Sequence, residues 1–181
     1  ACGRGEIGYS KMLLTPQFGP LQRLAFIFTD AELEYDEMYN GEPLCKKCMR
    51  CVRECPGNCI PDIKSGRTIK VSIAGKECEW ADIDMWKCYA FYTHAGRYQN
   101  PFVPKEVWDK NENGALDLME GKAEASEVEI MKVYGALQKY FPSWVGYNMA
   151  KCGGCIRGCV SRLEMKDGCL AGRFEAPLRT K

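Results

Sequence analysis

Residues 45–56 read Cys45-Lys-Lys-Cys48-Met-Arg-Cys51-Val-Arg-Glu-Cys55-Pro56, which is a C-x2-C-x2-C-x3-C-P run. This spacing is a ligand pattern for [4Fe-4S] clusters. The two-residue spacers let the first three sulfurs bind three irons of one cube. The longer spacer and the proline direct Cys55 toward a different cluster. The run therefore predicts two clusters, and it requires further cysteines elsewhere in the chain.

A second run, Cys152-Gly-Gly-Cys155-Ile-Arg-Gly-Cys159, supplies three more sulfurs with C-x2-C-x3-C spacing. Pseudo-symmetry between the runs gives Cys159 the role of Cys55, so that it crosses back to the first cluster. The predicted ligands of the first cluster are Cys45, Cys48, Cys51 and Cys159. Those of the second are Cys55, Cys152, Cys155 and one of Cys2, Cys59, Cys78, Cys88 or Cys169.

The composition limits the other interpretations. The chain has 181 residues, 12 cysteines and a formal net charge of +1, so there is no strong field to attract nucleic acid. No apolar run is long enough to insert into a membrane. An even cysteine count could indicate disulfides, but close clustering favours metal ligation, and the unassigned cysteines are expected to be buried free thiols. Such a protein needs reducing surroundings, so we expect a cytoplasmic location, with export through an upstream signal left open.

The predicted fold class is α+β. Residues 1–44 form an N-terminal α/β segment, in which Leu24–Thr29 is predicted to be a buried strand. Residues 45–100 and 151–181 form a bacterial-ferredoxin-like double [4Fe-4S] domain, with a short strand at 67–73. Residues 101–150 form a helical insertion. Its main helix is predicted over Ser126–Phe141, with Ser126 and Glu129 spaced as a capping box.

The insertion also contains a candidate calcium loop. Residues 109–120 fit D-x-[DN]-x-[DN]-G-x5-E, the EF-hand pattern. The oxygen ligands would be Asp109, Asn111, Asn113, the Ala115 carbonyl, Asp117 and Glu120. The alternative is an ordinary Asx-rich surface turn, because no partner EF-hand is present and Gly121 interrupts the exiting helix.

Basic residues surround both cysteine runs. They form either a solvated basic face or a docking patch for an acidic electron donor. These residues are Lys46, Lys47, Arg50, Arg53, Lys151, Arg157 and Arg162.

Taken together, the motifs resemble the C-terminal part of corrinoid-dependent reductive dehalogenases and epoxyqueuosine reductases. The stretches that carry the resemblance are Gly5–Arg23 with Thr29-Asp30, Cys45–Pro56 with Ile60, and Trp80–Tyr89 followed by Cys152–Cys159. In this family a cysteine in a Lys-Cys-Tyr setting joins the distal run. The resemblance therefore implies that Cys88 is the eighth cluster ligand.

The resemblance also implies a corrinoid, which family members hold in an upstream nitroreductase-like domain and to which the clusters relay electrons. Residues 1–44 resemble the end of that corrinoid-binding, nitroreductase-like core, so by analogy Gly19, Pro20 and Arg23 would lie near the corrinoid. The 181 residues do not contain the corrinoid-binding half or its catalytic acid. Tyr9 stands where the dehalogenases often have Arg, Val160 replaces a proline after Cys159, and about 50 residues are inserted between Cys88 and Cys152.

Three hypotheses follow. The first is electron transfer through two clusters to a corrinoid or other redox centre, on a redox partner protein or an upstream domain. The second is that the chain forms part of a corrinoid-dependent oxidoreductase of the reductive dehalogenase or epoxyqueuosine reductase type. The third is a docking module that its clusters stabilise. The sequence supports no catalytic residue of its own.

Overall fold

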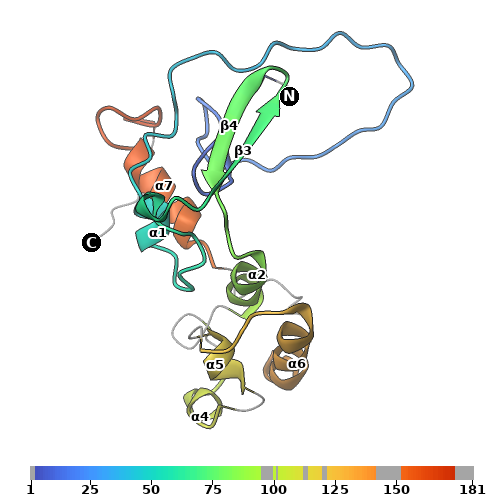
Figure 1. The fold of residues 1–181 in the computed structure, drawn as a ribbon, viewed down its shortest axis with the longest axis vertical. Coiled ribbons are helices and arrows are strands. Elements are labelled where there is room, and N and C mark those ends of the chain that lie inside the picture. Colours follow the sequence, from blue (N-terminus) through green and yellow to red (C-terminus); the bar gives the residue numbers. More distant parts are fainter. Residues whose placement is uncertain are drawn as a thin grey trace. The chain divides into compact units, whose positions relative to one another are not determined.

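The computed structural model describes residues 3–94, 100, 102–111, 114–119, 122–141 and 152–173 (Figure 1). The chain divides into two compact units. Unit 1 comprises Ala1–Glu54, Ile60–Asp82 and Cys155–Lys181, and unit 2 comprises Cys55–Cys59 and Ile83–Gly154. The described residues form helices and two small antiparallel sheets. This mixture agrees with the predicted α+β class.

Unit 1 contains both sheets. β1 (Glu6–Ile7) pairs with β2 (Leu13–Leu14), and β3 (Thr68–Ile73) pairs with β4 (Lys76–Ala81). Ala74 and Gly75 connect β3 to β4, and both have positive φ, as a two-residue hairpin turn requires. The strand predicted at 67–73 is confirmed by β3. The two sheets are joined where the Ala81 N–H donates to the Tyr9 carbonyl at 2.9 Å.

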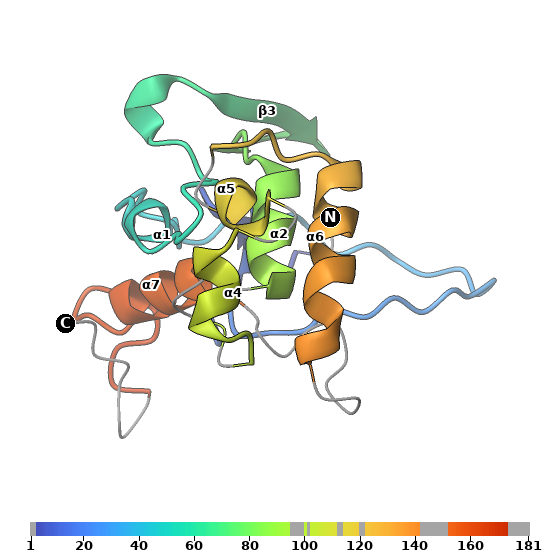
Figure 2. The ribbon, with the colours of Figure 1, turned by 90° about the horizontal axis from the view of Figure 1, so that it is seen from below.

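Two helices of unit 1 pack closely together: α1 (Arg50–Arg53) and α7 (Gly154–Leu163) (Figures 1 and 2). A Cβ placed on Gly158 would lie 2.9 Å from the Glu54 Cγ and 3.3 Å from the Arg50 carbonyl oxygen. Glycine at 158 therefore permits this close approach. The Arg50 guanidinium also donates to the Ser161 hydroxyl at 2.7 Å. A short 3-10 helix, η1 (Ile63–Ser65), precedes β3.

Unit 2 is helical. Its elements are α2 (Met85–His94), α4 (Lys105–Asp109), α5 (Ala115–Met119), α6 (Glu127–Leu137) and the 3-10 helix η3 (Gln138–Tyr140). Figure 2 shows α4, α5, α2 and α6 as neighbours. Their shared core surrounds the fully buried Trp108 and contains Phe91, Ile130 and Leu137. No helix in the described part of the chain is both long and apolar enough to cross a membrane.

The predicted helix of the insertion is confirmed. α6 begins directly after Ser126, whose hydroxyl accepts a hydrogen bond from the Glu129 N–H at 3.4 Å. Ile130, Val133 and Leu137 form its buried face, in agreement with helical spacing. The helix is shorter than predicted, since residues 138–140 tighten into η3 and Pro142 lies outside the described residues.

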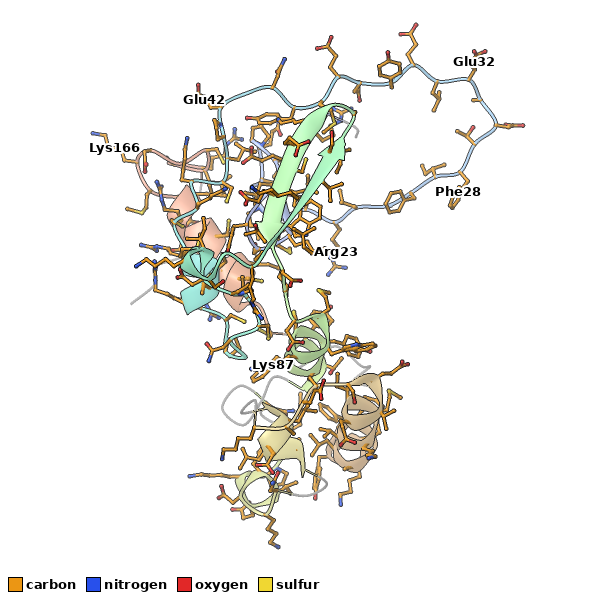
Figure 3. The ribbon with its side chains drawn as sticks, viewed as in Figure 1. Arg23, Phe28, Glu32, Glu42, Lys87 and Lys166 are labelled. Carbon is orange, nitrogen blue, oxygen red and sulfur yellow. The ribbon has the colours of Figure 1, made fainter. Side chains whose placement is uncertain are left out.

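The strand predicted at Leu24–Thr29 is wrong. Residues 21–40 form no regular secondary structure and extend away from the sheets of unit 1 as a long loop, here called the apolar arm (Figures 1 and 3). Phe26, Ile27 and Phe28 are 88%, 91% and 98% exposed. The apolar pattern is that of a buried strand, but a strand requires a partner for its backbone hydrogen bonds. None of the described strands pairs with it.

Candidate iron–sulfur centres

The first cysteine run folds into a tight loop ahead of α1. Lys47 and Met49, on either side of Cys48, both have positive φ, at 48° and 57°. Residues other than glycine seldom adopt this conformation unless their surroundings enforce it. The left-handed backbone conformation at Lys47 and Met49 bends the chain on both sides of Cys48. α1 then begins at Arg50 and carries Cys51 on its first turn.

The loop and α7 bring four sulfurs to one cavity, here called the four-cysteine cavity. Its lining includes Cys45 and Cys48 from the loop, Cys51 from α1 and Cys159 from α7. Apolar walls come from Leu14, Leu44, Met49 and Leu163. The structure thus brings together all four cysteines predicted for the first cluster, and all four belong to unit 1.

The turn between β1 and β2 supports Cys45. The Tyr9 N–H donates to the Cys45 Sγ at 3.3 Å, and the Cys45 N–H donates to the Glu6 carboxylate at 2.5 Å. Tyr9 is itself held, because its hydroxyl donates to the Pro61 carbonyl at 3.0 Å. A Cβ on Gly8 would lie 3.6 Å from the Cys45 sulfur. An N–H directed at a ligand sulfur is a contact that stabilises a thiolate and tunes a cluster.

The electrostatics of the four-cysteine cavity disfavour bare thiolates. Burial raises the pKa of the Cys51 thiol from the ordinary 9.0 to about 11, with the Cys45 and Cys48 sulfurs adding to the shift. Burial likewise raises the pKa of Cys159 to about 12. Thiolates crowded in an apolar site repel one another. A cationic iron core would compensate this charge, so four such sulfurs fit a cluster better than they fit isolated anions.

Most of the basic residues around this cavity are engaged by neighbours. Lys47 pairs with Glu79 at 2.6 Å and Arg162 pairs with Asp167 at 2.6 Å. Arg157 lies 3.6 Å from Glu54. Each of these three pairs offsets one positive charge, and the docking patch for an acidic electron donor stays a prediction. Lys151 lies outside the described residues.

Unit 2 contains four cysteines of its own: Cys55, Cys59, Cys88 and Cys152. Cys59 is 1% exposed within the core, and the other three pack against that core partly buried. Cys88 is carried by α2. The Cys59 N–H donates to the Cys55 Sγ at 3.3 Å. A hydrogen bond from the Cys59 thiol to Cys55 raises the pKa of Cys59, with burial next in effect and Cys88 contributing.

Three of the four cysteines predicted for the second cluster therefore share unit 2, namely Cys55, Cys88 and Cys152. The fourth, Cys155, belongs to unit 1, where its charge contributes to the raised pKa values of Cys51 and Cys159. Cys59 was one of five candidates for the last ligand of the second cluster, and the family resemblance favoured Cys88 instead. Its position four residues after Cys55 and two after Gly57 was the available signal. A Cβ on Gly57 would lie 2.7 Å from the Cys59 sulfur, so glycine at position 57 lets the backbone approach this sulfur closely.

None of the described cysteines forms a disulfide. Among the described residues, no three His, Cys, Asp or Glu side chains are placed to share a single metal ion. A four-iron cube sets a different requirement, because each cysteine binds its own iron around the cube. Cys78 and Cys169 are partly buried and do not line the four-cysteine cavity, and Cys2 lies outside the described residues.

The calcium prediction receives no support. The Asn111 side-chain oxygen, one predicted ligand, accepts from the N–H groups of Leu116 and Asp117 at 2.8 and 3.3 Å. Its amide donates to the Asp117 carboxylate at 2.8 Å. This geometry is that of an Asx cap at the start of α5, the ordinary alternative. Asp109 is exposed and Ala115 is buried, while Asn113 and Glu120 lie outside the described residues.

Two of the three residues predicted to lie near a corrinoid are buried within unit 1. A Cβ on Gly19 would lie 2.8 Å from the Leu163 Cδ1 and 3.0 Å from the Leu170 Cδ1. Pro20 is buried beside it, and only Arg23 is exposed, at the base of the apolar arm (Figure 3).

A cysteine-rich α+β chain with these sulfur groupings fits an oxidoreductase-related role, and comparison with known proteins narrows the relationship. No protein-family model matches the chain, and no solved structure matches it. Curated proteins named tetrachloroethene reductive dehalogenase do. Those from Desulfitobacterium hafniense (strain Y51) and Dehalobacter restrictus are each 28% identical over 156 residues, covering 81% of this chain and 26% of the relative. That from Sulfurospirillum multivorans is 31% identical over 117 residues, covering 59% of this chain and 23% of the relative.

The chain is therefore related to the reductive dehalogenases. It spans about a quarter of the length of the curated relatives that it matches.

Proposed function

We propose that this chain holds two [4Fe-4S] clusters and transfers single electrons to a redox centre on a partner protein or on a domain of the kind its relatives carry outside the matched region. The observation that carries the proposal is the convergence of Cys45, Cys48, Cys51 and Cys159 on one apolar-walled cavity. These four residues would hold the first cluster. A [4Fe-4S] cluster supplies reversible one-electron storage.

The second cluster would be held by Cys55, Cys88, Cys152 and Cys155. Cys55 is the last cysteine of the first run, so the short stretch between Cys51 and Cys55 would connect the two ligand sets. The first three pack against the core of unit 2. Cys59 would act on this cluster through its contact with Cys55. A bacterial-ferredoxin-like arrangement of the double-cluster domain is part of this proposal.

Residues around the first cluster would stabilise its ligands and limit its contact with water. The Tyr9 N–H would stabilise the Cys45 thiolate, and the Glu6 carboxylate would fix the backbone of Cys45. The apolar walls would exclude water from the first cluster. Hydrogen bonds to ligand sulfurs and low solvent access are two determinants of a cluster's potential.

The test is anaerobic reconstitution followed by iron and sulfide analysis and EPR of the reduced protein. We expect about eight irons per chain and the signals of two reduced [4Fe-4S] clusters. A preparation that never exceeds about four irons would refute the proposal of two clusters. Clusters that resist reduction throughout the accessible range would instead favour the docking-module hypothesis.

A second candidate is that the chain acts within a corrinoid-dependent reductive dehalogenase. The relatives' printed name, tetrachloroethene reductive dehalogenase, favours it. In that case the clusters would deliver electrons to a corrinoid bound outside these 181 residues. Corrinoid absorbance in native material containing this chain, with turnover of a chlorinated ethene, would separate this candidate from simple electron transfer.

A further inference from the structure

The solvent side of α6, in the helical insertion of unit 2, carries exposed apolar residues. Val128 and Met131 are 62% and 53% exposed, and Gly135 is exposed one turn further along. These three residues are spaced three and four apart, so they form one stripe along the helix, opposite its buried face. Figure 2 shows α6 at one edge of the helical group of unit 2. The stripe, here called the α6 seam, is therefore an apolar face that its own unit does not cover.

Gly135 is the unusual member of the α6 seam. It lies inside the helix, where glycine is destabilising relative to alanine. A Cβ placed on it would meet no atom of the described residues within 4 Å. Packing within unit 2 therefore gives no reason for glycine at this position. A second helix lying against the seam does give one, because a small residue at the contact lets two helices approach closely.

The charges along the same side of α6 change from acidic to basic. Glu124 and Glu127 lie at the beginning of the helix, Lys132 and Lys139 lie toward its end, and all four are exposed. A second copy of α6 that runs antiparallel brings the acidic end of one helix to the basic end of the other, whereas a parallel copy places like charges together. Lys132 pairs with Glu129 at 2.6 Å, which offsets the repulsion between two copies of Lys132 near the centre of such a contact.

We propose that the α6 seam is the contact of a homodimer, in which α6 packs antiparallel against α6 of a second copy of this chain. A two-fold axis between residues 131 and 132 places Val128 of each copy against Gly135 of the other. The same axis brings Glu124 of each copy to Lys139 of the other. The valine side chain would fill the space that glycine leaves, and one ion pair would close each end. A single patch then serves both copies, as two-fold symmetry requires.

The size of the α6 seam limits the strength of this dimer. The helix has 11 residues, so it is about 16 Å long. The contact therefore belongs to the small end of specific interfaces. We expect a reversible monomer–dimer equilibrium, and it does not depend on the clusters.

The experiment is sedimentation equilibrium of the full 181-residue chain, purified anaerobically, from about 1 μM to about 500 μM. We expect dimer at the higher concentrations. Gly135→Leu should weaken association by at least about tenfold, because the added side chain occupies the space of Val128 of the second copy. The thermal midpoint of the monomer should not fall in this variant, because leucine is a better helix former than glycine and its Cβ has room.

An exchange of charges tests the antiparallel arrangement. Lys139→Glu should weaken the dimer by about threefold to tenfold, because both ion pairs become repulsive. Adding Glu124→Lys to the same chain should restore association, since the pairs form again with the charges reversed. Lys110→Glu is the matched control: it makes the same charge change at an exposed lysine of unit 2 outside the seam and should leave association unchanged.

Three results would overturn the proposal: a chain that stays monomeric over the whole concentration range, a dimer that tolerates Gly135→Leu, and a charge-exchanged variant that does not recover. Phe28→Asp should leave the dimer intact, and loss of association in that variant would assign self-association to the apolar arm instead. Iron analysis of the same samples separates this proposal from the proposed function. A dimer without clusters would leave the α6 proposal standing while the electron-transfer proposal fails, and a cluster-loaded monomer would do the reverse.

Discussion

The backbone N–H of Cys59 donates to the sulfur of Cys55 at 3.3 Å. Cys59 is 1% exposed and belongs to the hydrophobic core of unit 2. Cys55 is a proposed ligand of the second cluster, so Cys59 contacts that ligand from inside unit 2. Hydrogen bonds to ligand sulfurs stabilise the reduced, more negative cluster. Cys59 therefore has a role that can be separated from ligation.

For Cys59→Ala we expect the iron content to stay at about eight per chain, because the eight proposed ligands remain. The thiol hydrogen bond to Cys55 is lost, so the potential of one cluster should become more negative. Redox titration followed by EPR checks this. Cys155→Ala is the comparison and should lose about four irons. If Cys59→Ala loses them instead, Cys59 replaces Cys155 as the fourth ligand.

The four-cysteine cavity gives a second prediction. Cys159→Ala should reduce the iron content from about eight to about four, because the first cluster loses the ligand that α7 contributes. Cys169→Ala is the matched control: it removes another partly buried thiol of unit 1 that does not line the cavity. Equal iron loss in both variants would indicate general destabilisation rather than loss of a ligand.

The core of unit 2 gives a third prediction, using two adjacent residues of α6. Ile130 is 1% exposed and Met131 is 53% exposed. Ile130→Ala should lower the free energy of unfolding by about 2–5 kcal/mol, because it leaves a cavity in the core of unit 2. Met131→Ala should change it by less than about 0.5 kcal/mol. Urea denaturation of the two variants makes the comparison, and similar losses would contradict the burial pattern of α6.

The raised thiol pKa values predict how the cluster-free chain responds to pH. In the unfolded chain these thiols ionise near the ordinary 9.0, whereas in the folded chain Cys51 ionises at about 11 and Cys159 at about 12. Between these values the unfolded state has released protons that the folded state retains, so rising pH favours unfolding. The stabilising contribution is complete below about pH 9 and is lost progressively above it.

The measurement is the urea midpoint of the cluster-free chain between about pH 8 and about pH 11. The double variant Cys51→Ala/Cys159→Ala retains the titrating lysines and tyrosines and serves as the control. We expect its midpoint to fall less steeply with pH than that of the unmodified chain. Parallel pH profiles would show that these two thiols ionise normally in the folded chain.

Local structure was largely predictable. The β3 strand and the start of α6 at Ser126 follow from short-range patterns that act between residues a few positions apart. The cysteine grouping of the first run also follows from spacing, since Cys45, Cys48 and Cys51 lie within seven residues and line one cavity. The crossing of Cys159 to those three was a symmetry argument, and the structure places Cys159 in the lining of the same cavity.

The sequence by itself determined the chemistry of this protein: twelve cysteines, two spaced cysteine runs, and an apolar segment with the pattern of a strand. Only the tertiary structure decided which distant groups meet. It placed Cys59 against Cys55, buried Gly19 against Leu163, and left Phe28 exposed. The physical reason is that spacing controls contacts within a turn, whereas burial depends on what the rest of the fold supplies. A strand pattern becomes a strand only where a partner completes its hydrogen bonds.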